Sequence, residues 1–430
     1  MNIDKQKLVS SKTFCIMPWI HLSTEPSGDV KICCLASKTI RNDQNEVYNL
    51  GYHSIKEIYN NSQIRKNRED MLNGIQIPDC NHCWKEEASG GISQRTSFTN
   101  KWLADQPELV DKIKDSILNN YEVTYTPVYY DFRFGNLCNL KCRSCGSLNS
   151  TQINKEYKDL YSKTKSMYFS DSGEKYDQLN DWYKTEQFKT NVFDTLNTIE
   201  KIYVTGGEPT LIEENYELLS KLVEIDRAKH VTVMFNTNMT NLKDEFYDLI
   251  SKFKHVEMAI SIEGYGKVQE YLRYPSTWNH IDKNIRRLAA LPNNVSIFAV
   301  PVVQIVNLEY ITDFWNYIEE INSDYGFYRI RMLPIILDSP EISNIANLPL
   351  EYKLQCWNKI ETFVKHSQWL KDDIYFMGRY NNIRMRCQTD SYNKELLSRF
   401  REFTELLDLH RAQSLNDVNP TLYKLINNDK

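Results

Sequence analysis

The sequence from position 134 to position 145 reads Phe134-Gly135-Asn136-Leu137-Cys138-Asn139-Leu140-Lys141-Cys142-Arg143-Ser144-Cys145. It follows an apolar run that is typical of a buried strand. The spacing C-x3-C-x2-C lets one loop bring three thiolates around a compact metal centre. A four-iron cluster held by three cysteines leaves one iron open for another ligand. Zinc takes a fourth cysteine or histidine, and none follows closely in the sequence, so the pattern favours iron–sulfur over zinc.

Short apolar strands alternate with helical patterns from this loop onward. The expected strands are Val128–Phe134, Lys201–Thr205, Val231–Asn236, Val256–Ser261, Val295–Gln304 and Tyr328–Leu333, and the expected helices between them include Glu214–Arg227, Lys243–Phe253, Trp278–Leu291 and Glu309–Ile321. This alternation predicts an α/β fold with a parallel sheet and right-handed crossovers. The repeats are too few for a complete eight-stranded barrel. We therefore expect a partial (β/α)6 TIM-like barrel over residues 127–334, followed by a mainly helical region over 335–430.

Polar residues and glycines follow the later strands. Val204-Thr205-Gly206-Gly207-Glu208-Pro209-Thr210 comes after the second strand, where glycines allow close backbone approach and Glu208 can accept from a cationic amino group. Asn236, Asn238, Ser261 and Glu263 stand at the ends of the third and fourth strands, with Arg273 shortly after. In β/α barrels chemistry gathers at the carboxyl ends of the strands. The alternative is that these polar side chains only cap solvent-facing turns.

The cysteine triplet followed by Gly-Gly-Glu-Pro resembles the radical S-adenosylmethionine (SAM) superfamily over about residues 127–334. The resemblance implies that Cys138, Cys142 and Cys145 hold a [4Fe–4S] cluster whose open iron chelates the methionine part of SAM. Reductive cleavage then yields a 5′-deoxyadenosyl radical that takes hydrogen from a substrate. The resemblance further implies SAM-binding roles for Gly206, Gly207, Glu208, Pro209, Asn236, Asn238, Ser261, Glu263 and Arg273, with Gln304 and Asn307 as weaker candidates. Ser144 departs from the family, which commonly has an aromatic residue there, near adenine.

A second cysteine set lies in the N-terminal segment. Cys15 and Cys33 flank a hairpin expected at Gly28-Asp29, and Cys80-Asn81-His82-Cys83 follows a helical pattern over Ser54–Asn73. From spacing alone, structural zinc and a four-iron cluster are comparable. The arrangement resembles the twitch domain, a short form of the SPASM auxiliary-cluster module, and this implies a second [4Fe–4S] cluster in residues 13–97. Residues 98–126 suit a helical linker.

Other cysteines and histidines carry plainer interpretations. Cys34 can replace Cys33 as a ligand, although a small buried side chain is the preferred interpretation. His21 is expected to be a hydrogen-bonding neighbour of the cysteines, as is His82. Cys356 and Cys387 lack metal spacing and are expected to be core thiols.

Composition limits the class of protein. The chain has 430 residues, ten cysteines and a net charge of −5, which argues against a broad nucleic-acid surface. No signal peptide or membrane span is recognisable, so we expect a cytoplasmic protein with reduced thiols. The expected partners are a low-potential flavodoxin or ferredoxin and a substrate. A peptide or protein side chain is the leading substrate class. The alternatives are oxidation of a small sugar, alcohol or nucleoside-type molecule, and a non-catalytic iron–sulfur binding or relay protein. No residue is assigned as a catalytic acid or base.

Overall fold

The computed structural model describes residues 3–88 and 90–427. The chain forms two compact units, one made of Met1–Leu137, Asp177–Met234 and Lys252–Lys254, the other of Cys138–Tyr176, Phe235–Ser251 and His255–Lys430. The boundary falls between Leu137 and Cys138. The cysteine triplet therefore belongs to the second unit, and the Gly-Gly-Glu-Pro loop to the first.

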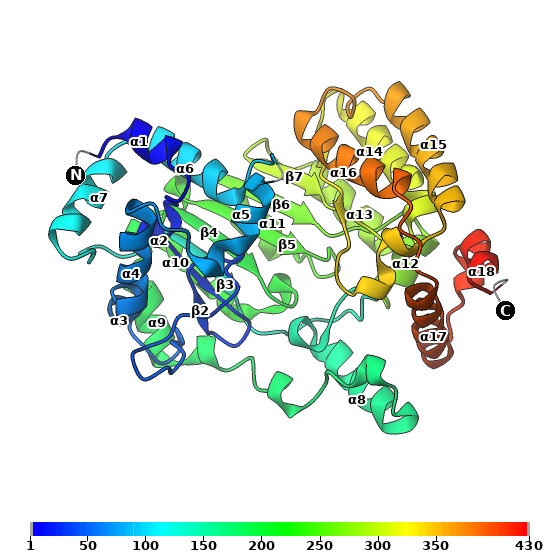
Figure 1. Ribbon diagram of the computed structural model, residues 1–430, viewed down its shortest axis with the longest axis horizontal. Coiled ribbons are helices and arrows are strands. Elements are labelled where there is room, and N and C mark those ends of the chain that lie inside the picture. Colours follow the sequence, from blue (N-terminus) through cyan, green and yellow to red (C-terminus); the bar gives the residue numbers. More distant parts are fainter. Residues whose placement is uncertain (1–2, 89, 428–430) are drawn as a thin grey trace. The chain divides into compact units, whose positions relative to one another are not determined.

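The first unit is built on a mixed group of strands (Figure 1). β1 (His21–Thr24) pairs antiparallel with β2 (Val30–Lys31) and parallel with β3 (Tyr129–Arg133), and β3 pairs parallel with β4 (Lys201–Thr205). The expected hairpin at Gly28 is confirmed, with φ at +86°. The parallel pairing of β1 with β3 was not expected, because nothing in the sequence links two strands so far apart.

Residues on β3 alternate between two environments. Tyr130, Phe132 and Phe134 stack in sequence with ring centroids 5.2 Å apart at each step, and they form an aromatic core with Phe188. Because successive strand residues point to opposite faces, Tyr129, Asp131 and Arg133 share the other face. That face meets the cysteine-rich N-terminal segment.

The helices of the first unit depart from expectation at one point. Ser54 caps its helix with a capping box, but the single helix expected over Ser54–Asn73 is two helices. The side chain of Asn61 accepts from the N–H of Ile64 and starts the second helix, so the chain turns there. The helices are α1 (Lys5–Ser10), α2 (Met17–Ile20), α3 (Ile55–Tyr59), α4 (Ser62–Leu72), α5 (Asn81–Ala88), α6 (Gln94–Asp105), α7 (Leu109–Leu118), α9 (Glu186–Phe193) and α10 (Glu213–Glu224).

The second unit contains the later strands. β6 (His255–Ile260) pairs parallel with β7 (Val295–Ala299), and β7 with β9 (Ile330–Met332). The strand expected over Val295–Gln304 is interrupted, because Pro301 has no N–H for a ladder. β8 (Val302–Val303) pairs instead with β10 (Ile335–Ile336). β5 (Thr232–Thr237) begins in the first unit and ends in the second.

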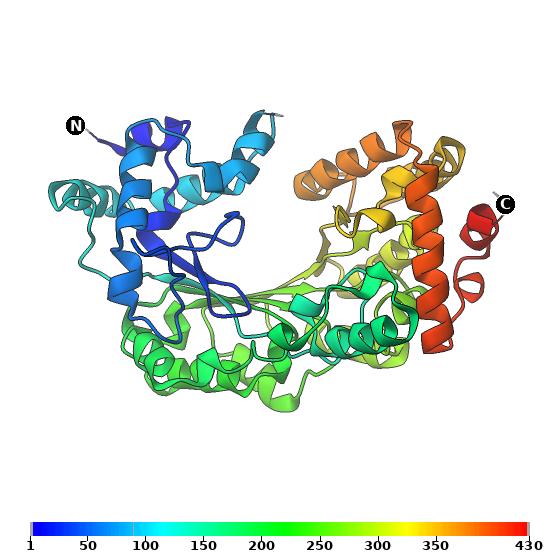
Figure 2. The same cartoon turned by 60° about the horizontal axis from the view of Figure 1, so that its bottom comes forward.

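Helices dominate the rest of this unit. In Figure 1 α14, α15 and α16 lie side by side, and in Figure 2 α17 stands beside α18. The helices are α8 (Thr151–Thr164), α11 (Asp244–Ile250), α12 (Lys267–Leu272), α13 (Trp278–Ala289), α14 (Ile311–Tyr325), α15 (Leu350–His366), α16 (Ile374–Gln388), α17 (Lys394–Arg411) and α18 (Pro420–Asn427). Among the described residues, no helix combines the length and apolar character that crossing a bilayer requires. The α/β class and the helical C-terminal region are confirmed.

Candidate iron–sulfur and cofactor sites

The triplet loop holds its three thiols together. Cys138 and Cys142 are buried around Leu140, and Cys145 packs against them. The backbone of the loop is fixed by a neighbouring segment: the N–H of Lys141 donates to the carbonyl of Tyr274 at 2.7 Å, and that of Arg143 to Leu272 at 2.9 Å. The residue between those two acceptors is Arg273. The loop is therefore tied to the segment that carries the predicted SAM-binding arginine.

Arg273 lies in the electrostatic field of the thiols. Burial alone lowers the pKa of its guanidinium, but the thiolates of the triplet and the carboxylate of Glu263 outweigh burial and raise it. Arg273 donates to Glu263 at 2.8 Å. Its buried Nε has no hydrogen-bond partner among the described residues, and the same is true of Nε2 of Gln304. A free buried donor on Arg273, which interacts with the three thiols, suits an anionic group such as a carboxylate, so this residue fits the SAM and cluster that the motifs imply.

The other polar strand ends are tied together around the loop. Asn238 donates to Asn139 at 3.0 Å, and its amide lies 3.9 Å from the sulfur of Cys138. Asn307 donates to the carbonyl of Glu263 at 2.7 Å. Ser261 and Asn236 stand at the ends of β6 and β5, as expected. The second unit thus gathers all of the SAM-binding candidates that follow the third strand.

The Gly-Gly-Glu-Pro loop is packed against the start of the triplet loop within the first unit. The N–H of Glu208 donates to the carbonyl of Leu137 at 2.8 Å, and Leu137 directly precedes Cys138. A Cβ on Gly207 would lie 2.2 Å from that carbonyl oxygen. Glu208 is buried and accepts from the Thr210 hydroxyl at 2.7 Å, and Pro209 begins a short helical turn. Glycine is required here by close backbone approach.

Replacing Gly207 with alanine is expected to weaken SAM binding by about fivefold or more. The added methyl group must displace the carbonyl of Leu137, and overpacking of this kind costs about 1–3 kcal/mol. Equilibrium dialysis of SAM against the reconstituted protein measures the effect. Gly378→Ala is the matched control, since nothing lies within 4 Å of a Cβ there. Equal SAM affinity in the two variants would contradict the packing argument.

The four N-terminal cysteines line one cavity. Cys15, Cys33, Cys80 and Cys83 surround it together with His82 and Arg95. Burial first, and then the other thiols, raise the pKa of Cys15 well above its usual value. Within residues 3–88 and 90–427, no three His, Cys, Asp or Glu side chains converge as the ligands of a single metal ion do. Four thiols around a cavity suit a cluster of several atoms.

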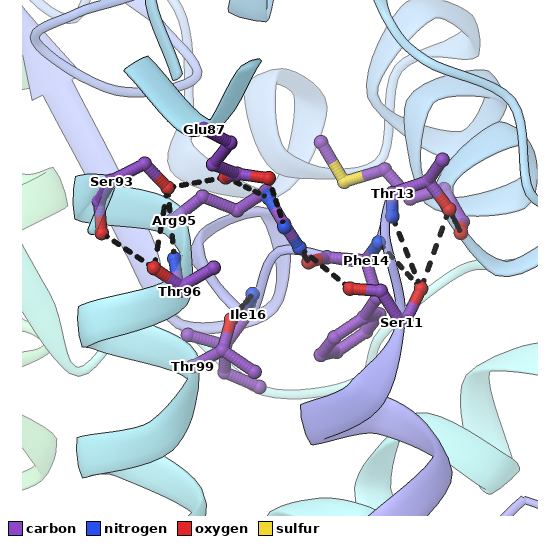
Figure 3. Close-up of polar contacts among 10 residues, drawn as sticks. Ser11, Thr13, Phe14, Ile16, Glu87, Ser93, Arg95, Thr96 and Thr99 are labelled. Carbon is purple, nitrogen blue, oxygen red and sulfur yellow. Dashed lines mark hydrogen bonds and ion pairs between the residues drawn. The ribbon is translucent and has the colours of Figure 1, made fainter. Parts of the chain in front are cut away.

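Arg95 joins the two halves of this cysteine set (Figure 3). Its guanidinium donates to both carboxylate oxygens of Glu87, at 2.8 and 2.6 Å. Glu87 lies on α5, the helix that carries Cys83. The same guanidinium donates to the carbonyl of Phe14, directly before Cys15, at 2.6 Å. Sequence reasoning missed Arg95 and Glu87, because no motif marks an ion pair eight positions apart on two helices.

The side chains next to the cavity are structural neighbours. Nδ1 of His21 lies 3.3 Å from the carbonyl of Ile32, and burial lowers the pKa of His21 to about 3. The neutral ring is thus a hydrogen-bonding group, as expected. Cys34 is partly buried and turns toward Gln94, with the two polar atoms 3.9 Å apart. It is not among the residues that line the cavity.

Asp131 is a buried acid on the face of β3 that meets this segment. It accepts from the hydroxyl of Ser23 at 3.1 Å, and this bond and the positive charge of Arg133 both lower its pKa. Burial nonetheless raises the pKa of Asp131 from 3.8 to about 6. No sequence pattern singles out this strand residue. A buried carboxyl group with a raised pKa favours its protonated form in the folded chain.

Replacing Asp131 with asparagine is expected to change how stability depends on pH. The carboxyl group of Asp131 keeps its proton up to about pH 6 in the folded chain and only to about pH 4 in the unfolded chain. The contribution of Asp131 to the free energy of unfolding therefore falls as pH rises from about 4 to about 6. The shift of about 2 pH units corresponds to about 3 kcal/mol. Urea unfolding of both proteins across the window measures the difference. Parallel stability curves would contradict it.

The two C-terminal cysteines are core thiols, as expected. Cys356 and Cys387 are 2% and 0% exposed. All ten cysteines are free of disulfides.

A loop with three packed thiols, and a cavity lined by four more, define an iron–sulfur protein of the α/β class. The model of the radical SAM superfamily matches residues 132–317, and that of an iron–sulfur cluster-binding domain, SPASM, matches residues 15–84. The chain therefore contains a radical SAM domain, and its SPASM-type domain lies N-terminal to that domain. Its cofactors are a [4Fe–4S] cluster with SAM and an auxiliary iron–sulfur cluster.

Solved structures resemble the chain only distantly. Streptococcus suis SuiB bound to S-adenosylmethionine is 13% identical over 70% of this chain and 62% of its own, with a TM-score of 0.35. SuiB bound to the precursor peptide SuiA is 15% identical over 67% and 61%, also at 0.35. Native anSMEcpe with bound AdoMet and Cp18Cys peptide is 15% identical over 59% and 61%, again at 0.35. The chain thus spans about three fifths of these proteins. No curated protein matches it.

Proposed function

We propose that this chain is a radical SAM enzyme that abstracts hydrogen from a peptide or protein side chain, with the auxiliary cluster in electron transfer. The observation that carries the proposal is the packed triplet of Cys138, Cys142 and Cys145 beside Arg273. When bound and reduced, a cluster of this kind supplies the electron that cleaves SAM to a 5′-deoxyadenosyl radical.

The residues of the chain have defined parts in this proposal. The three thiols hold the cluster, and the guanidinium of Arg273 offers its free Nε to the carboxylate of SAM. Glu208 provides a buried carboxylate for the cationic amino group. Burial of Cys138 and Cys142 keeps water from these two thiols, which preserves their interactions in a low dielectric. The four N-terminal cysteines hold the auxiliary cluster.

The proposed substrate class is supported by a cavity of the second unit. It measures about 570 Å³ and opens beside Ser144 and Cys145. Aromatic and apolar side chains line it together with polar and charged groups, among them Arg399 and Glu341. Pockets of this size and mixed lining are typical ligand sites. Auxiliary modules in this family commonly accompany peptide modification, and a peptide segment fills such a cavity.

Release of 5′-deoxyadenosine tests the enzyme assignment. The anaerobically reconstituted protein, incubated with dithionite and SAM, should release it, and the absence of release would leave a non-catalytic iron–sulfur protein. Adding a pool of cellular peptides should increase the release and give a peptide whose mass changes only with enzyme, SAM and reductant together. Stimulation by sugars and nucleosides instead would assign the small-molecule alternative.

A further inference from the structure

Helix α17 of the second unit is linked to the triplet loop through buried charges. Arg411, at the end of α17, donates to both oxygens of Glu156 on α8, at 3.0 and 2.5 Å. The two side chains are 1% and 0% exposed. Sequence patterns single out neither residue. A bidentate pair without water contact is one of the strongest polar interactions in a fold.

This pair is joined to the loop between the cysteines. Nζ of Lys141, the residue before Cys142, lies 3.5 Å from Glu156, and Nε2 of His410 lies 3.7 Å from it. Arg411 also lies over the ring of Tyr274, 5.4 Å from its centroid. Tyr274 accepts the backbone N–H of Lys141. Glu156 therefore contacts the triplet loop through Lys141, and Arg411 contacts Tyr274, whose carbonyl accepts from the backbone of the same loop.

The ion pair with Glu156 leaves one nitrogen of the Arg411 guanidinium without a hydrogen bond among the described residues. This nitrogen is the buried Nη1. Arg411 is also one of the charges that act on the Cys142 thiol, with the sign that favours its thiolate. A buried cation near thiolates acts at low dielectric, where charge interactions are little screened.

We propose that Arg411 tunes the triplet site: its buried charge raises the reduction potential of the cluster that the thiols hold, and Glu156 opposes it. This rests on the proposed function, since only a bound cluster has such a potential. Reduction moves one electron from dithionite to the cluster and adds one negative charge beside Arg411. A nearby cation stabilises that added charge, and a nearby carboxylate destabilises it. Hydrogen bonds and charges around a cluster are known determinants of its potential.

A redox titration followed by electron paramagnetic resonance, without SAM, tests this. Arg411→Gln should give a more negative midpoint potential than the parent protein, and Glu156→Gln a more positive one. Opposite shifts of the midpoint potential cannot arise from a general loosening of the structure, because loosening would shift the potential of both variants in the same direction. Lys163→Gln, on the exposed face of α8, is the control and should leave the potential unchanged.

Arg411→Gln leaves Glu156 without its main partner, so this variant can fail to fold. The double variant Glu156→Gln/Arg411→Gln removes both charges, and it can be compared with Glu156→Gln if Arg411→Gln does not fold. Its potential should be more negative than that of Glu156→Gln alone. Equal potentials in those two variants, or shifts in one direction for both single variants, would overturn the role of Arg411. If the parent protein assembles no reducible triplet cluster, the proposed function itself fails.

Discussion

The triple variant of Cys138, Cys142 and Cys145 to alanine is expected to release no 5′-deoxyadenosine and to keep its auxiliary cluster. The three thiols form one packed group in the second unit, whereas the four N-terminal thiols belong to the first. Iron should fall from about eight to about four atoms per chain, since each cubane contains four. Quantitative iron analysis and chromatography of the reaction mixture measure the two effects.

The matched control for this variant removes thiols that the fold buries elsewhere. Cys356→Ala and Cys387→Ala delete buried thiols of the same unit that lie outside both cysteine groups. They should retain the full iron content and activity, although each leaves a small core cavity that costs stability. Retained 5′-deoxyadenosine release in the triple variant would remove the triplet from the mechanism.

Short-range patterns predicted most of the fold. The apolar runs at Lys201–Thr205 and around Val231–Asn236 are strands. They could be predicted because a buried strand is marked by a short run of consecutive apolar residues. The C-x3-C-x2-C and C-x2-C spacings are likewise local patterns that can be seen in the sequence. Interruptions were harder to see. The break at Asn61 depends on one side chain that can cap a helix as well as continue it.

Long-range pairings could not be predicted. Arg411 and Glu156 lie 255 positions apart, and neither stands in a motif. Their pairing depends on how α17 packs on α8, which follows from tertiary packing and not from helical periodicity. The role of Arg95 could not be predicted either, because it depends on the hydrogen bond from Arg95 to the distant carbonyl of Phe14. A buried ion pair carries no sequence pattern of its own.

Replacing Cys80 and Cys83 together with alanine is expected to lower the iron content by about half and to destabilise the first unit. These thiols line the N-terminal cavity with Cys15 and Cys33, so the site would lose two of four ligands. Because ligands converge only in the folded chain, binding of the metal contributes to folding. Metal analysis together with thermal unfolding measures both effects. Zinc in place of iron in the parent protein would contradict the cluster assignment.

Two neighbouring thiols give the sharpest control for this site. Cys33 lines the cavity, whereas Cys34 turns toward Gln94. Cys33→Ala should therefore lose auxiliary iron, and Cys34→Ala should keep it. The side chains are identical and adjacent, so a difference between the variants reports ligation and not burial or size. The reverse result would make Cys34 the ligand. Cleavage of SAM should persist in the Cys80/Cys83 variant, because the triplet belongs to the other unit and retains all three of its thiols.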